Sequence, residues 1–417
     1  MKESIKKRIE SVRRGEVPEG YRRAKDIGIA PADWKVGQLS DVLHNEPRPV
    51  SKPNNPYWRL GIRSWAKGTF RAYVDDPTAV DMGELYVVRE NDLVVNITFA
   101  WEHAIAVASK EDDGLLVSHR FPTYVFDRGN VPAYYKAVVS QQYFKDMLDH
   151  ISPGGAGRNR VLNRKNFLAL PCHVPPVAEQ QKIAEILEAC DRMIELKQSK
   201  IDELKKLKQV CLLEMFPQKG QTIPKRRFPG FSAPWEQRKF EEIAVRSSVI
   251  CADANLPRVE YEDIVSGTGR LNKDIYAKES SKSGIAFHQG DVLYGKLRPY
   301  LQNWLLPEFD GLAVGDFWVL QPQNADSSFL YRLIQSRQFD EVANQSTGTK
   351  MPRADWKLVS KTVFSIPSNI CEQAAIGTYF TALDNLITLH QRELAEVGKY
   401  KKALMQLLLT GLVRVNA

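Results

Sequence analysis

An internal repeat constrains the fold of this chain more than any other feature of its sequence. When Glu179 is placed on Glu372, segments 179–216 and 372–409 align without a gap. A repeat of this length is typical of a chain built from two copies of one structural unit. Identical residues recur at Glu179/Glu372, Gln180/Gln373, Ile183/Ile376, Asp191/Asp384, Ile194/Ile387, Leu196/Leu389, Gln198/Gln391, Glu203/Glu396, Lys206/Lys399 and Lys208/Lys401.

The repeat continues upstream, although the offset drifts as insertions in loops would make it drift. "PADWKVGQLSDV" (31–42) resembles "SAPWEQRKFEEI" (232–243), with Trp34 on Trp235, and "ENDLVV" (90–95) resembles "QGDVLY" (289–294). The chain therefore has two copies of one plan, each with a mixed domain of about 130–140 residues followed by a long helix.

Both repeated segments show the apolar period of a long helix. Apolar residues recur at alternating steps of three and four, which predicts a coiled-coil seam. Pro175, Pro176 and Pro217 bracket the first segment; Asn369 with Glu372 forms a predicted capping box before the second, and Gly411 follows it. The seam residues are Leu187, Cys190, Ile194, Ile201, Leu204, Cys211 and Met215, then Phe380, Leu383, Ile387, Leu394, Val397, Leu404 and Leu408.

The order of the elements predicts that the two helices are antiparallel. The first helix leads into the second domain and the second helix leaves it, and the two ends of a compact domain usually lie close together. A helix over 179–216 would be about 57 Å long at ~1.5 Å per residue. We therefore expect two mixed domains separated by an antiparallel two-helix coiled coil, related by a pseudo-twofold axis.

Lysine and histidine interrupt the apolar seam at equivalent positions, Lys197/His390 and Lys208/Lys401. Such residues specify the register of two helices or receive a partner. Alternatively, the lysine stems pack on the seam and the ammonium groups reach solvent.

Short β-rich segments separated by turn residues precede each helix. Helical stretches follow them at 133–148 and 328–345, so the fold class is α+β. The predicted segments are a basic lead-in (1–33), a first domain (34–175), a first spacer helix (176–216), a linker (217–234), a second domain (235–367), a second spacer helix (368–411) and a tail (412–417).

Basic, turn-rich loops follow the helical stretch of both domains, at 152–167 and 345–358. Arginine forks suit guanine edges and phosphate oxygens, whereas a solvated basic loop is the alternative. "GDVLYGKLRPY" (290–300) adds two further cations. The candidate DNA-binding residues are Arg158, Arg160, Arg164, Lys165, Lys296, Arg298, Lys350, Arg353 and Lys357.

Composition agrees with a polyanionic partner without requiring one. Lys and Arg number 58 against 50 Asp and Glu, a formal charge of +8. The five cysteines form no C-x-x-C pair, which favours reduced thiols, and the longest apolar run, at 404–413, is too short to span a bilayer. We expect a soluble protein in the cytoplasm.

The residues resemble a family, the specificity subunits of type I restriction-modification enzymes. The resemblance covers nearly the whole chain and is carried by "PPVAEQQKI", "CEQAAI", "LLLTGLVRV", the two domain starts "YRRAKDIGIAPADWKVGQL" and "IPKRRFPGFSAPWEQRKF", and "GDVLYGKLRP". It departs from the family plan in its long basic lead-in of uncertain placement, and "ENDLVVNITFAW" matches more loosely than its counterpart in the second domain.

The resemblance implies that each mixed domain is a target-recognition domain that reads one half of a split double-stranded DNA sequence. It also implies that the helices set the gap and bind two adenine-N6 methyltransferase subunits, with restriction and translocase subunits joining the complex. S-adenosylmethionine and ATP are then expected on those partners only, and this chain has no cofactor of its own. The helix residues implied for these contacts are Glu179, Gln180, Ile194, Leu204, Glu372, Gln373, Ile387 and Val397.

Two other functions stay open on the residues alone. "NNPYW" (54–58) is similar to the motif by which adenine methyltransferases hold their target, but one proline is missing and no glycine-rich loop precedes it. The chain also has no G-x-x-x-x-G-K-[ST] loop, and its seven histidines lack metal-ligand spacing. The lone G-x-G of "SGTGRL" (266–271) is interpreted as a turn. A stand-alone DNA-binding regulator is the other alternative; it would form no complex with a methyltransferase.

Overall fold

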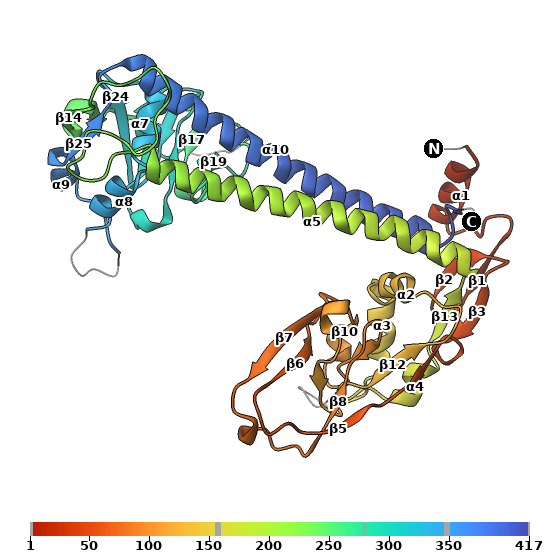
Figure 1. Ribbon diagram of the computed structural model, residues 1–417. Helices are drawn as coiled ribbons and strands as arrows, with labels where there is room; N and C mark the ends of the chain where they lie inside the picture. Colours follow the sequence, from red (N-terminus) through yellow and green to blue (C-terminus); the bar gives the residue numbers. More distant parts are fainter. Residues whose placement is uncertain (1–2, 155–159, 278–280, 346–350, 416–417) are drawn as a thin grey trace. The chain divides into compact units, whose positions relative to one another are not determined.

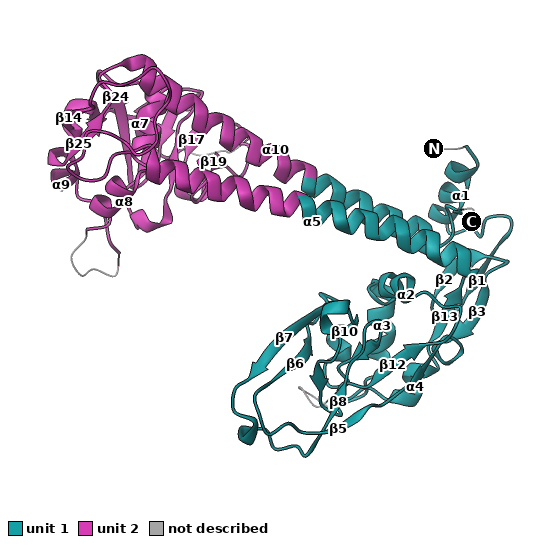
Figure 2. Ribbon diagram, viewed as in Figure 1, with its two compact units in different colours: residues 1–196, 394–417 teal, residues 197–393 magenta. Residues whose placement is uncertain are grey.

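The chain divides into two compact units. The computed structural model describes residues 3–154, 160–277, 281–345 and 351–415. Unit 1 consists of residues 1–196 and 394–417, and unit 2 consists of residues 197–393 (Figure 2). Both units therefore combine a mixed domain with one stretch of each long helix, and the division falls within the helices rather than at their ends.

The two long helices are present as predicted. Helix α5 runs from Val177–Glu214 and helix α10 from Ile370–Leu409 (Figure 1). Their bounds lie slightly inside the predicted 176–216 and 368–411. Pro175 and Pro176 precede α5, where the missing N–H of proline costs nothing, and Gly411 beyond α10 has a left-handed φ of 62°.

Ion pairs inside each unit show that the helices are antiparallel. In unit 2 the Lys208 Nζ lies 2.7 Å from the Asp384 carboxylate. In unit 1 the repeat-equivalent residues, Lys401 and Asp191, form the same ion pair with the two helices exchanged. Unit 2 also pairs Lys197 with Glu393, so the residue number falls on one helix as it rises on the other, and the predicted antiparallel pairing is confirmed.

The lysines that interrupt the seam are neither free nor merely packed on it. Besides Lys208 and Lys401, Lys197 lies 2.6 Å from Glu393 of the other helix, while His390 bonds to Glu393 on its own helix. Pairs between helices fix the register of antiparallel partners, because a shift of one turn would separate every pair. Register is therefore the role that the geometry favours for these positions.

The apolar seam is covered along both helices. Leu187, Ile201, Leu204 and Cys211 of α5 are buried, and Cys190 and Ile194 are half-buried. On α10 the buried seam residues are Phe380, Leu383, Ile387 and Leu408, with Leu394, Val397 and Leu404 half-buried.

Unit 1 holds its strands in two larger sheets and two pairs. One sheet has the order β10-β9-β12-β4 and the other the order β5-β8-β11-β6-β7, and the pairs are β1-β2 and β13-β3. The strands are β1 (Tyr21–Ala24), β2 (Gly28–Pro31), β3 (Lys35–Gln38), β4 (Leu43–Asn45), β5 (Pro49–Ser51), β6 (Tyr57–Ile62), β7 (Thr69–Val74), β8 (Glu84–Val87), β9 (Leu93–Val95), β10 (Ile105–Val107), β11 (Leu116–Val117), β12 (Thr123–Phe126) and β13 (Pro171–Val174).

Unit 2 repeats this plan. Its sheets have the orders β15-β24-β21-β22 and β16-β20-β23-β17, and its pairs are β14-β25 and β18-β19. The strands are β14 (Glu236–Lys239), β15 (Ala244–Ser247), β16 (Ile250–Cys251), β17 (Arg258–Val259), β18 (Ile264–Val265), β19 (Arg270–Leu271), β20 (Gly284–Phe287), β21 (Val292–Gly295), β22 (Trp304–Leu305), β23 (Gly311–Ala313), β24 (Phe317–Pro322) and β25 (Val363–Ile366).

Apart from β7, the strands of the two larger sheets of unit 1 correspond one to one with those of unit 2. Strand β9 matches β21, and the parallel pair β6·β11 matches the parallel pair β17·β23. In unit 1 the strand β6 continues into a hairpin with β7, paired from Tyr57↔Val74 to Ile62↔Thr69. In unit 2 the strand β17 has two residues and, within the described chain, pairs only with β23.

Each unit also contains short helices. They are α1 (Glu3–Arg13), α2 (Pro132–Val139), α3 (Gln142–His150) and α4 (Arg164–Leu168) in unit 1, and α6 (Phe240–Ile243), α7 (Ser327–Leu333), α8 (Arg337–Ala343) and α9 (Trp356–Lys361) in unit 2. Each of the two predicted helical stretches is in fact a pair of helices. Ser140 ends α2, and Ser336 caps the start of α8 by accepting a hydrogen bond from the Phe339 N–H.

The predicted capping box of the second long helix is half formed. The Asn369 side chain accepts a hydrogen bond from the Cys371 N–H, as a cap should. The Glu372 carboxylate does not turn back to Asn369, because Arg227 and Trp235 hold it instead. A carboxylate at this position therefore joins the helix start to the rest of unit 2.

The lead-in of residues 1–33 is placed in unit 1. Ile27 and Ala30 belong to the main core of that unit, which also contains Leu408 and Leu409 from the end of α10. The Tyr21 hydroxyl donates to the Gly411 carbonyl at 2.6 Å. Strands β1 and β2 thus pack beside the last turn of α10.

Candidate nucleic-acid interface

Two of the predicted basic segments of unit 2 lie side by side. The Arg298 N–H donates to the Pro352 carbonyl at 2.7 Å, and the Ala354 N–H donates to the Lys296 carbonyl at 2.8 Å. An isolated bridge joins Leu297 to Arg353. The structure therefore brings Lys296, Arg298 and Arg353 into one cluster, although they are far apart in the sequence.

An aspartate organises this cluster. Asp316 lies 3.4 Å from the Lys296 ammonium and 3.0 Å from the Arg353 guanidinium. Burial alone would raise the pKa of the Asp316 carboxyl, but its hydrogen bond to Arg353 and the two positive charges lower it below its usual value. The cations are thus held in place, with half of the Arg353 side chain exposed for a second anion.

Arg298 has an unusual backbone conformation beside this cluster. Its φ is 49°, in the left-handed region that non-glycine residues rarely adopt, and it precedes a 3-10 helix, Pro299–Leu301. Its Nε atom is buried and has no hydrogen-bond partner among the described residues. Tyr300, the next aromatic residue, is 58% exposed. Strained residues of this kind gather at binding sites.

The counterpart in unit 1 has the same backbone plan with different side chains. The Leu162 N–H donates to the Ile97 carbonyl at 2.8 Å, and a 3-10 helix, Ala100–Glu102, follows Phe99. Phe99 and Trp101 therefore stand where unit 2 has Arg298 and Tyr300. These different side chains explain why "ENDLVVNITFAW" matches the family less closely than its counterpart in unit 2.

The predicted arginines of unit 1 have structural partners. Arg160 donates to the Ser152 and Asp149 carbonyls and lies 5.3 Å above the Trp101 ring. Arg164 donates to the His119 carbonyl at 2.5 Å. These bonds orient the two side chains and leave their role in DNA binding a prediction.

The remaining predicted cations differ in their surroundings. Lys165 and Lys357 are exposed in the first turns of α4 and α9, helices capped by Asn163 and Asp355. Arg158 and Lys350 lie outside the described residues.

A basic and aromatic hairpin in unit 1 was missed by the sequence prediction. Strands β6 and β7 and their turn, residues 57–74, contain four cations and no acidic residue. Four aromatic side chains on this hairpin are exposed by 41–60%, and the rings of two of them are 4.9 Å apart. The cations are Arg59, Arg63, Lys67 and Arg71; the exposed aromatic residues are Trp58, Trp65, Phe70 and Tyr73, of which Trp58 and Tyr73 form the pair.

Local packing fixes the exposed face of this hairpin. A Cβ atom on Gly61 would lie 2.2 Å from the Phe70 ring, so only glycine lets that ring lie across the neighbouring strand. The Arg63 guanidinium sits 5.4 Å from the centre of the same ring. Two-stranded ribbons with cations and flat rings fit a nucleic-acid groove. A stretch free of acids with interleaved aromatics was the sequence signal that could have found it.

The helix residues predicted for partner contacts split into two groups. Glu179, Gln180, Glu372 and Gln373 at the helix starts are buried. The other four are seam positions: Leu204 and Ile387 are buried, while Ile194 and Val397 are half-buried.

The buried carboxylates at the helix starts form the same clamp in both units. Glu179 accepts from the Trp34 indole at 2.8 Å and from Arg414 at 2.7 Å. In unit 2, Glu372 accepts from the Trp235 indole at 3.2 Å and from Arg227 at 2.6 and 2.7 Å.

Gln180 and Gln373 complete this arrangement. Each accepts a hydrogen bond from a main-chain N–H at the start of a short helix, Val131 at 3.0 Å and Asp326 at 2.8 Å. Each also donates to a proline carbonyl just before the long helix. The repeated "EQ" pair therefore attaches each long helix to its own domain.

Other functional classes find no support in the described part of the chain. No group of His, Cys, Asp and Glu there could hold a metal ion, and no helix there is both long and apolar enough to cross a membrane. Burial raises the pKa of the Cys172 thiol to about 12, which keeps it protonated. Cys172 and His173 lie on β13, and the His173 ring bonds to the Ile27 carbonyl.

Residues 31–206 match the family model of the type I restriction modification DNA specificity domain. This segment is similar to members of that domain family. The family resemblance predicted from the sequence is therefore confirmed, and the internal repeat places a second copy of the same plan in unit 2.

Curated relatives and solved structures agree with this assignment. The putative type I restriction enzyme MjaX specificity subunit of Methanocaldococcus jannaschii is 22% identical over 95% of this chain and 97% of its own length. The MjaVIII specificity subunit of the same organism is 24% identical, and the match covers 61% of this chain and 65% of that protein, just under two thirds.

The fold recurs in solved structures of type I restriction-modification systems. A chain from a study of complex assembly and conformational transition in a type I R-M system has a TM-score of 0.56 at 16% identity, covering 92% of this chain and 99% of its own. The type I restriction-modification S subunit from M. genitalium has a TM-score of 0.54 at 13% identity, covering 92% and 97%. These likenesses establish the mixed fold with paired long helices.

Proposed function

We propose that this chain is the DNA-specificity subunit of a type I restriction-modification complex, a non-catalytic protein that reads a bipartite duplex sequence. The observation that carries the proposal is the match of residues 31–206 to the DNA specificity domain, together with the repeat of its plan in unit 2. Each unit would read one half of the target. A stand-alone regulator and an adenine methyltransferase are not favoured by these relatives.

The proposed DNA contacts are the clusters described above. In unit 2 they comprise Lys296, Arg298 and Arg353 beside the exposed Tyr300. In unit 1 they comprise the β6–β7 hairpin. Arginine forks that reach base edges would give sequence discrimination, worth about 1–3 kcal/mol for each bidentate contact, while lysines on phosphates would give affinity without sequence information.

Methyltransferase subunits, and restriction subunits with their translocase, are the proposed protein partners. They would carry the S-adenosylmethionine and ATP chemistry, and the complex would act on DNA in the cytoplasm. The chain's own part would be to bind and orient the target. The lengths of α5 and α10 would help set the gap between the two half-sites, because both helices run from one unit into the other.

The direct test is a salt titration of DNA binding by the purified chain with its methyltransferase. The target should be found first by sequencing the methylome of a host that expresses both proteins. If six to ten phosphates are neutralised, affinity should fall by about 10³–10⁵ between 50 and 200 mM salt. A flat salt response, or the failure of the two proteins to co-elute, would count against the proposal.

A second test addresses the gap. Removal of one heptad, residues 194–200, together with its repeat-equivalent 387–393, should shorten the gap between the half-sites and leave each half-sequence unchanged. Methylome sequencing reads both properties at once. A change in the half-sequences themselves would contradict the assignment of base reading to the mixed domains.

A further inference from the structure

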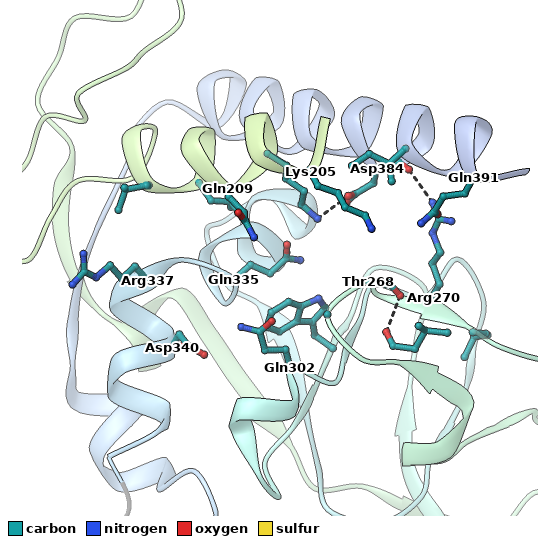
Figure 3. A pocket seen from close by; sticks show the side chains of 18 residues that line it. Lys205, Gln209, Thr268, Arg270, Gln302, Gln335, Arg337, Asp340, Asp384 and Gln391 are labelled. Carbon is teal, nitrogen blue, oxygen red and sulfur yellow. Dashed lines mark hydrogen bonds and ion pairs between the residues drawn. The ribbon is translucent and has the colours of Figure 1, made fainter. Parts of the chain in front are cut away.

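Unit 2 contains a pocket that the proposed function does not use. It has a volume of about 870 Å³, within the range of small-molecule sites. In Figure 3 its roof is formed by the long helices, with Lys205 and Gln391, and its floor by Gln302 and the turn that carries Thr268 and Arg270. All the residues that line it belong to unit 2.

Positive charge on the wall of this pocket exceeds negative charge. Asp384 is approached by three cations: its two carboxylate oxygens lie 2.7 Å from Lys208 and 2.7 Å from Arg332, and its carbonyl accepts from Arg270 at 2.8 Å. Burial, together with the neighbouring cations, lowers the pKa values of Lys208 and Arg270. The Asp384 carboxylate therefore pairs with two cations, Lys208 and Arg332, and a third cation, Arg270, bonds to the main-chain carbonyl of the same residue.

The other ionisable groups around the pocket do not reverse this balance. Lys205 adds a positive charge to the lining. Arg337 is paired with Glu341 at 2.7 Å, and the Asp340 carboxylate accepts from the Asn344 amide at 3.1 Å. The excess positive charge of the lining would therefore stabilise a bound anion.

Two buried donors in the pocket lining lack an acceptor. The indole Nε1 of Trp304 and the amide Nε2 of Gln335 have no hydrogen-bond partner among the described residues, and the two residues are only 5% and 9% exposed. The Gln335 oxygen faces Arg332 at 3.4 Å, so its NH₂ group points away from Arg332, toward the middle of the pocket in Figure 3. Buried donors without acceptors are rare and costly.

A glycine turn brings further donors to the same place. Gly267 and Gly269 of "SGTGRL" have φ values of 71° and 67°, and a Cβ atom on Gly269 would collide with the Tyr331 hydroxyl at 1.7 Å. Only glycine permits this approach. The turn between β18 and β19 places Thr268 in the pocket lining, and Arg270, the first residue of β19, follows it there (Figure 3).

We propose that this pocket binds a small organic phosphate of about mononucleotide size. Arg270, Trp304 and Gln335 would donate to the phosphate, whose several acceptor oxygens suit donors that arrive from different directions. The apolar side chains of the lining would hold the body of the ligand: Leu212, Val265, Leu271 and Ile387. A duplex backbone is too wide to bring a phosphate to donors that are more than nine-tenths buried.

Unit 1 lacks the chemistry of this pocket. The residues at the corresponding places are Thr69 for Arg270, Ile105 for Trp304, Ala137 for Arg332 and Ser140 for Gln335. Ile105 lies in the apolar core. The proposed site is therefore a property of unit 2 and stands independently of DNA recognition.

Isothermal titration of the full chain with AMP, inorganic phosphate and adenosine tests the proposal. We expect AMP to bind once per chain, inorganic phosphate to compete with it, and adenosine to bind at least about tenfold more weakly, since it lacks the charge. Absence of AMP binding up to about 10 mM, a concentration that reveals even millimolar affinity, overturns the proposal. Equal binding of adenosine also overturns it.

Variants assign the binding to the pocket. Arg270→Thr, which copies unit 1, should weaken AMP binding about tenfold or more, and Trp304→Phe, which removes the N–H but keeps an aromatic ring, should weaken it by a factor of about 3–10. Arg238→Thr is the control, because Arg238 pairs with Glu236 outside the pocket. Its affinity should equal that of the wild type.

The outcomes separate the sources of an effect. Equal loss in Arg238→Thr would show that the binding is nonspecific and contradict the site. If duplex DNA displaces AMP, and Arg270→Thr weakens DNA binding as strongly as AMP binding, the pocket is part of the DNA interface and the proposal fails. Circular dichroism and thermal unfolding of each variant exclude loss of the fold as the cause.

Discussion

Unit 1 and unit 2 are built to one plan, yet they differ where a ligand would touch them. The clamp of tryptophan, glutamate and arginine and the glutamine beside it recur in both units. Among the described residues, unit 1 alone extends β6 into a basic, aromatic hairpin, and unit 2 alone surrounds an aspartate with three cations. The repeat therefore preserves the contacts that attach helix to domain and varies the surfaces that recognise.

The largest expected effect concerns the shared clamp. Glu372→Ala should destabilise unit 2 by about 3 kcal/mol, because it leaves Arg227 without its carboxylate and the Trp235 indole without an acceptor. Glu179→Ala should cost unit 1 somewhat less, since the Arg414 side chain is 33% exposed against 13% for Arg227. Chemical denaturation monitored by hydrogen exchange in each unit measures both. A loss of stability in only one of the two units would contradict the equivalence of the two clamps.

The next effect separates the two DNA surfaces. Replacing Arg59 and Lys67 of the β6–β7 hairpin with alanine should weaken DNA binding by about 1–2 kcal/mol and reduce the salt slope by about one for each cation removed. Only the half-site read by unit 1 should lose discrimination.

Lys182→Ala on α5 is the matched control for the hairpin variants, because Lys182 pairs with Glu185 on the same helix. It should leave both the affinity and the slope unchanged. If the hairpin variants bind as the control does, the assignment of this hairpin to the interface is wrong.

Acid should change the stability of the two units in opposite directions. Burial lowers the pKa of His103, and likewise that of His173, both in unit 1. In the unfolded chain each of these histidines takes up a proton below its ordinary pKa of about 6.5. In folded unit 1 the same histidines stay neutral to lower pH. Unit 1 therefore loses stability as the pH falls from about 7 to 5.5.

The exposed histidine of unit 2 behaves in the opposite way. Asp310 raises the pKa of His288, so its small stabilising contribution is full below about pH 6.5 and is lost as pH rises through the folded pKa. His44 of unit 1, also exposed and raised in pKa by Asp127, offsets part of the expected difference. Denaturation of wild type and His103→Gln at both pH values should show a flatter profile for the variant. An unchanged profile would exclude His103 as the cause.

The smallest effect concerns the equivalent lysines of the helix seam. Lys401→Met should cost unit 1 about 0.5 kcal/mol, because Asp191 then has no cation on the opposite helix. Lys208→Met should leave unit 2 nearly unchanged, since Asp384 keeps Arg332 and Arg270. Thermal unfolding of the two variants compares them. A larger loss for Lys208→Met would contradict the excess of positive charge around Asp384.

Periodicity and repetition predicted the long-range plan of the molecule well. The seam residues, the antiparallel pairing and the alignment of Trp34 with Trp235 follow from spacing that any repeat of a helical segment must keep. The family resemblance followed from the same segments. The short helices were predicted less accurately. The predicted helices 133–148 and 328–345 are each divided into two near a serine, and such breaks depend on local capping and not on the apolar period.

The candidate sites were harder to predict, because they depend on side chains that tertiary structure brings together. The approach of Lys296 to Arg353 through Asp316 joins segments that no local pattern connects. The sequence predicts Glu372 as a capping residue, whereas in the structure its carboxylate pairs with Arg227. Most of the charge around the pocket likewise comes from long-range contacts, with Arg270 from a segment that the sequence identified only as a turn and Asp384 from helix α10.

The division of the chain into units has a consequence for its synthesis on the ribosome. Unit 2 is one continuous stretch of chain, so all of it can assemble once residue 393 has emerged. Unit 1 waits longer: its Glu179 carboxylate meets Arg414 only after the whole of unit 2 has been translated. The nascent first half must therefore carry an uncovered helix face while the second half is being made, and that interval is when the protein is most exposed to misfolding and chaperone capture.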